Sequence, residues 1–169
     1  MDKLNTLLKK AAHSGFYLWL LNFILLKKVP FNKSHKIKIQ SIENDELTIV
    51  AANKRYNQNH IKGIHACLLA TLCEYASGLS LLLSLSPKEY RIILKTIQMT
   101  YHYQAKTDVM VKFKISPEEI QFILQSLQKE AVAFKEFTVD VYDENKNHIC
   151  TGLINWQIKA WKNVKMKID

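Results

Sequence analysis

Residues 64–83 read IHACLLATLCEYASGLSLLL and contain one charged residue, Glu74. When this stretch is placed on a helix, apolar and small side chains leave no broad polar face. A helix that is apolar nearly all round is buried on most of its sides. We therefore expect a central helix that the rest of the chain surrounds.

Six stretches with period-two alternation of apolar residues predict six strands, two before this helix and four after it. Turn residues at 44–45 and 143–145 are typical of antiparallel hairpins. The pattern predicts an α+β fold, in which an antiparallel six-stranded sheet wraps around a central helix. The alternating sets are Ile37 and Ile39; Leu47 and Ile49; Ile93, Ile97, Met99, Tyr101 and Tyr103; Val109, Val111, Phe113 and Ile115; Phe137, Val139 and Val141; and Ile154, Trp156 and Ile158.

Two further helices are expected. Ser116 and Glu119 form a capping-box pattern at the start of an amphipathic helix over 117–129. Residues 16–26, FYLWLLNFILL, are too few to span a bilayer and lack a cleavage site. They favour an N-terminal helix packed on the domain, with association with a membrane surface as the alternative. Residues 30–34 resemble a linker, which divides the chain into an N-terminal helix and joint (1–34) and a folded domain (35–169).

The composition fits one globular domain with a basic balance. The chain has 169 residues, and 24 Lys and Arg against 15 Asp and Glu give a net charge of +9. This charge favours a polyanionic partner such as nucleic acid, an acidic membrane surface or the phosphates of coenzyme A. Only Arg55 and Arg91 are arginines. Because arginine dominates specific base readout, we expect no nucleic-acid partner.

Three cysteines, Cys67, Cys73 and Cys150, lie in apolar surroundings. An odd number of this kind indicates buried thiols in a reducing compartment, so we expect a cytoplasmic protein. Neither the cysteines nor the six histidines have the spacing of metal ligands, and no metal is expected.

Glu74 is a catalytic candidate because an unpaired carboxylate is costly in an apolar setting. The other interpretation is that it reaches solvent or pairs with a lysine for structural reasons. Upstream, residues 57–66 (NQNHIKGIHA) form a polar loop that leads into the helix. The first helical turn offers unpaired N–H groups, which suit an oxyanion or a polarised carbonyl. Asn59 can hold a water or an acyl oxygen, while His65 is either a base or a hydrogen-bonded structural residue.

His65 and Glu74 are nine positions apart, which on a helix is about 13 Å along the axis and roughly 180° in direction. One protomer is therefore not expected to bring them into one site. A second copy with its helix antiparallel alongside would place Glu74 of one chain opposite the loop of the other, residues 59–66. We expect a homodimer with two equivalent sites, or a tetramer containing it.

Asn59, His65 and Glu74, at these spacings on a loop and a central helix, resemble the hotdog-fold acyl-CoA thioesterases, and in particular the phenylacetyl-CoA-thioesterase-like group. The resemblance covers about residues 36 to 160 and implies a hotdog fold. It implies that Asn59 positions water or substrate and that the backbone N–H of Ala66, after His65, polarises the thioester carbonyl. Glu74 from the partner subunit would be the general base or nucleophile.

Some features depart from that family. The common His-Gly-Gly is His65-Ala66-Cys67 here, the acid is glutamate where aspartate is more usual, and the helix after Ser116 is extra. Dehydratases of the same fold place their acid about fourteen positions after the histidine, where this chain has Leu79. The dehydratase interpretation therefore fails.

The resemblance implies an enzyme that hydrolyses an acyl-CoA thioester to the free acid and coenzyme A. Coenzyme A is then part of the substrate, and no separate cofactor is expected. The alternative is a non-catalytic module that binds acyl-CoA or an acyl-carrier protein, because a fold alone does not imply turnover.

Overall fold

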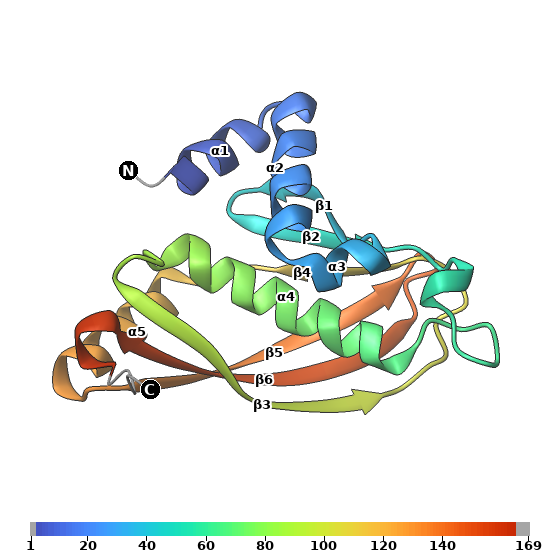
Figure 1. Cartoon of the computed structure of the whole chain (residues 1–169). Coiled ribbons are helices and arrows are strands. Elements are labelled where there is room, and N and C mark those ends of the chain that lie inside the picture. The colour runs from blue at the N-terminus through green and yellow to red at the C-terminus, as the bar shows by residue number, and fades with distance from the viewer. Residues whose placement is uncertain (1–2, 165–169) are drawn as a thin grey trace, which may run out of the picture.

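The computed structural model describes residues 3–164 (Figure 1). In chain order its helices and strands are α1 (Lys3–Ala11), α2 (Gly15–Lys28), α3 (Pro30–His35), β1 (Lys38–Glu43), β2 (Glu46–Ala51), the 3-10 turn η1 (Arg55–Asn57), α4 (Ala66–Ser84), β3 (Tyr90–Tyr101), β4 (Val109–Phe113), α5 (Pro117–Lys129), β5 (Ala133–Asp143), β6 (His148–Ala160) and the 3-10 turn η2 (Trp161–Asn163).

The predicted sheet and central helix are confirmed. Six antiparallel strands form one sheet in the order β1-β2-β4-β5-β6-β3, and α4 packs against strands β2 to β6 (Figure 1). The β1–β2 hairpin turns at Asn44 and Asp45, both in the left-handed region that such a tight turn needs. The capping box at Ser116 is also present and begins α5 as predicted.

Helix α4 forms the centre of the core, as its sequence indicates. It begins at Ala66 and ends at Ser84, within two residues of the predicted bounds, and most of its side chains are buried. Within residues 3–164 it is the one helix long and apolar enough to cross a membrane. Its burial is typical of the core helix of a soluble protein. Cys67 is exposed, contrary to the sequence prediction, because it lies in the first turn, whereas Cys73 and Cys150 are buried.

Gly78 lets α4 lie close to the sheet, since a Cβ at this position would be 2.8 Å from the Trp156 ring. We expect Gly78→Ala to lower the free energy of unfolding by about 1–3 kcal/mol through overpacking, although alanine is the better helix former. Urea unfolding measures this effect. Gly15→Ala is the matched control, because nothing lies within 4 Å of its Cβ position. Equal midpoints for the two variants would contradict the prediction.

The N-terminal segment is more structured than expected. Residues 30–34, predicted to be a joint, lie in helix α3, which has Pro30 in its first turn. Its C-cap is Lys36, whose backbone is in the left-handed region. Helix α2 is held on β1 by Asn22, whose side chain accepts from the Ile39 N–H (2.8 Å) and donates to the Ile39 carbonyl (2.9 Å). Leu21 of α2 is fully buried in the core cluster that also contains α4 and the sheet. The division at residue 34 stays a prediction.

Strand β3 differs from the sequence prediction in which of its residues share a face. The expectation that Ile93 and Ile97 share a face is wrong, because a β-bulge between Leu94 and Thr96 reverses the alternation. Leu94, opposite Trp156 on β6, shares the α4-facing side with Ile97, and both line one pocket. Strand β3 is also a free edge of the sheet.

Candidate active site

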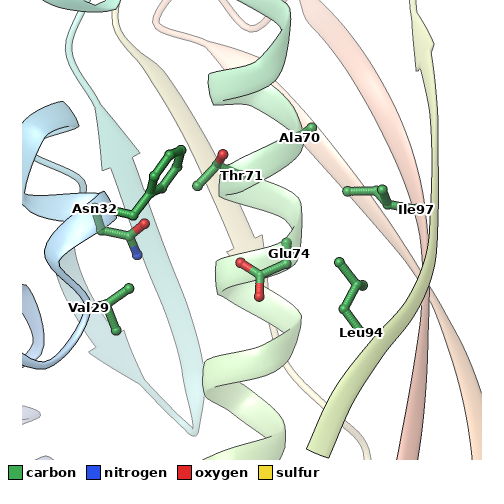
Figure 2. Close-up of a pocket in the computed structure, with 8 residues that line it drawn as sticks. Val29, Asn32, Ala70, Thr71, Glu74, Leu94 and Ile97 are labelled. Carbon is green, nitrogen blue, oxygen red and sulfur yellow. The ribbon is translucent and has the colours of Figure 1, made fainter.

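Glu74 lies in a pocket of about 330 Å³ bounded by α4, β3 and α3 (Figure 2). The α4 residues come from one face of the helix. Two aliphatic side chains of β3 lie across the pocket from α3 (Figure 2). The lining is apolar apart from three polar side chains, Asn32, Thr71 and Glu74. The full lining is Val29, Phe31, Asn32, Ala70, Thr71, Glu74, Leu94 and Ile97.

The environment of Glu74 favours its protonated form. Burial raises the pKa of the Glu74 carboxyl above its ordinary value of 4.5. Among the described residues, neither of the two salt bridges involves Glu74. A carboxylate held without a counter-ion in an apolar pocket is a better proton acceptor than one in water, which suits a general base.

The raised pKa of Glu74 predicts a pH-dependent stability difference. The folded chain holds this proton to a higher pH than the unfolded chain does. The stability that Glu74 contributes is therefore present below its ordinary pKa and is lost as pH rises through the raised value. We expect Glu74→Gln, which stays neutral, to have a higher Tm than the wild type at about pH 8, and the two to converge towards about pH 4. A Tm difference that does not change with pH would contradict this account.

Asn32 is a site residue that sequence analysis missed. It is 2 % exposed, and its side-chain Nδ2 has no hydrogen-bond partner within the described residues. Figure 2 shows the Asn32 amide on α3 and the Glu74 carboxylate on α4 on opposite sides of the pocket. An unpaired buried donor is costly, and a water or a substrate group bound in the pocket would satisfy it. The sequence signal was weak because 30–34 resembled a linker.

Asn59 shapes the loop that precedes α4. Its Oδ1 accepts from the N–H groups of Ile61 (3.0 Å) and Gly63 (3.1 Å), and its backbone N–H donates to the Gly63 carbonyl (2.8 Å). Its Nδ2 makes no hydrogen bond with any described residue and remains free to donate to a ligand. Gly63 packs closely against the next loop, since a Cβ there would lie 2.8 Å from the Gln104 side chain and displace it.

His65 is the N-cap of α4. Its Nδ1 accepts from the Cys67 N–H (3.1 Å), which places the proton of the neutral ring on Nε2 and gives His65 the structural role left open above. The backbone N–H of Ala66 has no partner among the described residues and lies at the positive end of the α4 dipole. His65 and Ala66 therefore lie at the start of α4, and Asn59 lies in the loop that leads into it.

Glu74 lies away from the start of α4 within one chain. Its pocket is lined by none of the loop residues 59–66 and lies about two turns further along α4. Within one chain, Asn59 in the loop and His65 and Ala66 at the start of α4 are thus separated from the Glu74 pocket. That these four residues form one site stays a prediction. Within residues 3–164, no group of three or more His, Cys, Asp or Glu side chains could hold a metal ion.

The sheet wrapped around α4 is the hotdog fold. Over residues 18–158 the chain matches the sequence profile of a family described as a domain of unknown function, DUF4442, and it belongs to that family. The match begins inside α2, so the family domain includes part of the N-terminal helical segment. No curated protein sequence matches the chain.

Solved structures with this fold include thioesterases. A protein of Pseudomonas aeruginosa described as a probable thioesterase is 20% identical, with a TM-score of 0.76 over 83% of this chain and 94% of that one. A thioesterase of Haemophilus influenzae is 10% identical, with a TM-score of 0.62 over 95% and 92%. A variant of a thioesterase of Staphylococcus aureus is 10% identical, with a TM-score of 0.60 over 77% and 98%. These similarities establish the fold.

Proposed function

We propose that the protein is a homodimeric, cytoplasmic thioesterase that hydrolyses an acyl-CoA to the free acid and coenzyme A. Glu74 is the general base. The unpaired N–H of Ala66 and the amide of Asn59, both from the partner's loop, bind the substrate. The observation that carries the proposal is the Glu74 carboxylate, which has no counter-ion among the described residues and lies in an otherwise largely apolar pocket.

The chemistry needs only groups that the chain and water supply. The Glu74 carboxylate accepts a proton from water, and the water oxygen attacks the thioester carbonyl carbon. The oxyanion that forms accepts a hydrogen bond from a backbone N–H at the start of α4. The carbon–sulfur bond then breaks, and the departing thiolate takes the proton back from Glu74. The products are a carboxylic acid and free coenzyme A.

The free edge of β3 supports a dimer. This 12-residue strand leaves its outer backbone groups unpaired, and Ile93, Leu94, Ile97 and Tyr101 on it are each between 36% and 48% exposed. Long apolar edges of this kind are normally covered. A second copy pairing through the same edge about a two-fold axis would place the two α4 helices antiparallel. Glu74 of one chain would then face the 59–66 loop of the other.

A spacing seen in one related structure also supports the assignment. The Staphylococcus aureus protein was crystallised as variants in which a glutamine and a glutamate, fifteen residues apart, were each replaced by alanine. Asn59 and Glu74 are separated by the same number of residues. In this chain the amide at this spacing lies in the loop before the central helix, and the carboxylate lies on that helix.

Release of free coenzyme A from a panel of acyl-CoA substrates, including phenylacetyl-CoA, tests the function. It should be followed by chromatography, because the exposed Cys67 thiol would react with thiol reagents. We expect kcat/KM of at least about 10⁴ M⁻¹s⁻¹ for the best substrate. Saturable binding of acyl-CoA without release would instead identify a binding module.

Asn32 gives a prediction that separates a role in function from a role in folding. We expect Asn32→Leu, which has the same branched shape and number of side-chain non-hydrogen atoms but no donor, to lower kcat/KM about tenfold or more by removing a hydrogen bond to bound water or substrate. The free energy of unfolding should be unchanged or higher, because a buried unpaired amide is removed. Steady-state kinetics and urea unfolding on the same preparation measure both. Full activity in the variant would remove Asn32 from the site.

A further inference from the structure

An aromatic ridge runs along the outer face of α2. Phe16, Trp19 and Phe23 follow one another at steps of three and four residues and are 65%, 59% and 45% exposed. Their rings contact in sequence, with centroids 6.1 Å apart for Phe16 and Trp19 and 5.8 Å apart for Trp19 and Phe23. The opposite face of the helix buries Leu21 and Leu25 in the core. Helix α2 is therefore apolar on two sides, and the domain covers only one of them.

The N-terminal segment that contains α2 carries most of the net positive charge of the chain. Residues 1–42 contain eight lysines and one acidic residue, Asp2, whereas the rest of the chain contains 16 basic and 14 acidic residues. Two of these lysines lie over aromatic rings of α2. The Lys27 Nζ is 4.6 Å from the Phe23 ring centroid, and the Lys10 Nζ is 5.1 Å from that of Tyr17. Exposed aromatic rings beside lysines complement an anionic lipid bilayer, whose interior is apolar and whose headgroups carry negative charge.

We propose that the outer face of α1 and α2 binds the surface of an anionic phospholipid bilayer. The ridge formed by Phe16, Trp19 and Phe23 would enter the headgroup region, while Lys9, Lys10, Lys27 and Lys28 would contact lipid phosphates. In Figure 1, α1 and α2 lie above α4 and the free β3 edge lies below it, so this face does not compete with the proposed dimer. The inference does not depend on the hydrolase activity.

Charge decides between this occupant and a second copy of the chain. Two copies meeting through this face would bring two lysine-rich segments together with no acidic residue between Lys3 and Ile42 to pair with them. Like charges brought together in this way oppose association. Lipid phosphates have the complementary sign. Val29, which follows α2, also lines the Glu74 pocket, so the bound helix would connect directly to the wall of that pocket.

Co-sedimentation of the full chain with vesicles tests the proposal. We expect binding to phosphatidylcholine vesicles that contain about one third phosphatidylglycerol, and at least about tenfold weaker binding to phosphatidylcholine alone or at high salt. The double variant Trp19→Ala, Phe23→Ala should lose binding about tenfold or more. Phe122→Ala on α5 removes an aromatic side chain that is 55% exposed and should leave binding unchanged.

Two double variants that each remove two lysine charges test the electrostatic part of the proposal. Lys27→Gln, Lys28→Gln should weaken binding to the anionic vesicles about tenfold, whereas Lys106→Gln, Lys112→Gln, at exposed positions elsewhere, should have little effect. Equal binding to neutral and anionic vesicles, or full binding by the aromatic double variant, would overturn the proposal. So would a change in oligomeric state of that variant in light scattering, because the ridge would then be a contact between copies.

Discussion

Glu74→Gln is expected to lower kcat for acyl-CoA hydrolysis about a hundredfold or more while the protein remains folded. The change removes the proton acceptor at nearly constant volume, so substrate binding and the surrounding pocket should persist. In the wild type, kcat should fall as pH decreases through the raised pKa of Glu74, because the protonated carboxyl cannot act as a base. Steady-state release of coenzyme A across a pH series measures both effects.

The matched control for this variant is Glu130→Gln. Glu130 is an exposed residue that caps the C-terminal end of α5, outside the Glu74 pocket. It should retain full turnover and the same pH profile. Unchanged turnover in a folded Glu74→Gln variant would make Glu74 a structural residue and would leave the pocket as a binding site only.

A hybrid dimer should recover the activity that two inactive parents lack. Asn59→Asp keeps the Oδ1 atom that accepts from Ile61 and Gly63 but loses the Nδ2 donor, so the loop should stay in place. Each parent, Asn59→Asp or Glu74→Gln, has the same defect in both sites of its homodimer. A dimer of one chain of each kind has one intact site, built from Glu74 of the first chain and Asn59 of the second. We expect about half of the wild-type activity per dimer.

Differently tagged chains, co-expressed and purified on both tags in succession, give the hybrid free of its parents. The dimer of Asn59→Asp with itself, purified in the same way, is the control. A hybrid no more active than its parents would contradict a site shared between protomers. It would require Glu74 and Asn59 of one chain to act together, which their separation along α4 disfavours.

Local sequence patterns predict much of the fold. The stretch around Glu74 predicts a buried helix because its apolar residues cover every face, and the structure has α4 at Ala66–Ser84. Turns and helix caps are also local, because they depend on residues only a few positions apart in the chain. Examples are the turn at Asn44 and Asp45 and the capping box at Ser116. Such signals can be read from the chain without knowledge of its tertiary contacts.

The spacing of the candidate site residues can also be read from the sequence without knowledge of tertiary contacts. Nine positions on one helix fix the separation of His65 and Glu74 whatever surrounds the helix. The capping role of His65 and the loop hydrogen bonds of Asn59 are likewise short-range, although only the structure shows that the histidine accepts from the Cys67 N–H. Sequence patterns could not show that Glu74 has no counter-ion within residues 3–164, because an ion-pair partner could come from any helix, strand or loop.

Tertiary structure alone decided the composition of the pocket. Asn32 reaches it because residues 30–34 form α3 beside α4, and Leu94 and Ile97 share its other wall because of the β3 bulge. Both features depend on contacts between segments far apart in the chain. A bulge is set by pairing with a partner strand, and a six-residue helix is too short to be stable without packing. The sequence by itself therefore determined the central helix, the strands and the spacing of Asn59, His65 and Glu74, while tertiary packing decided which side chains surround the carboxylate.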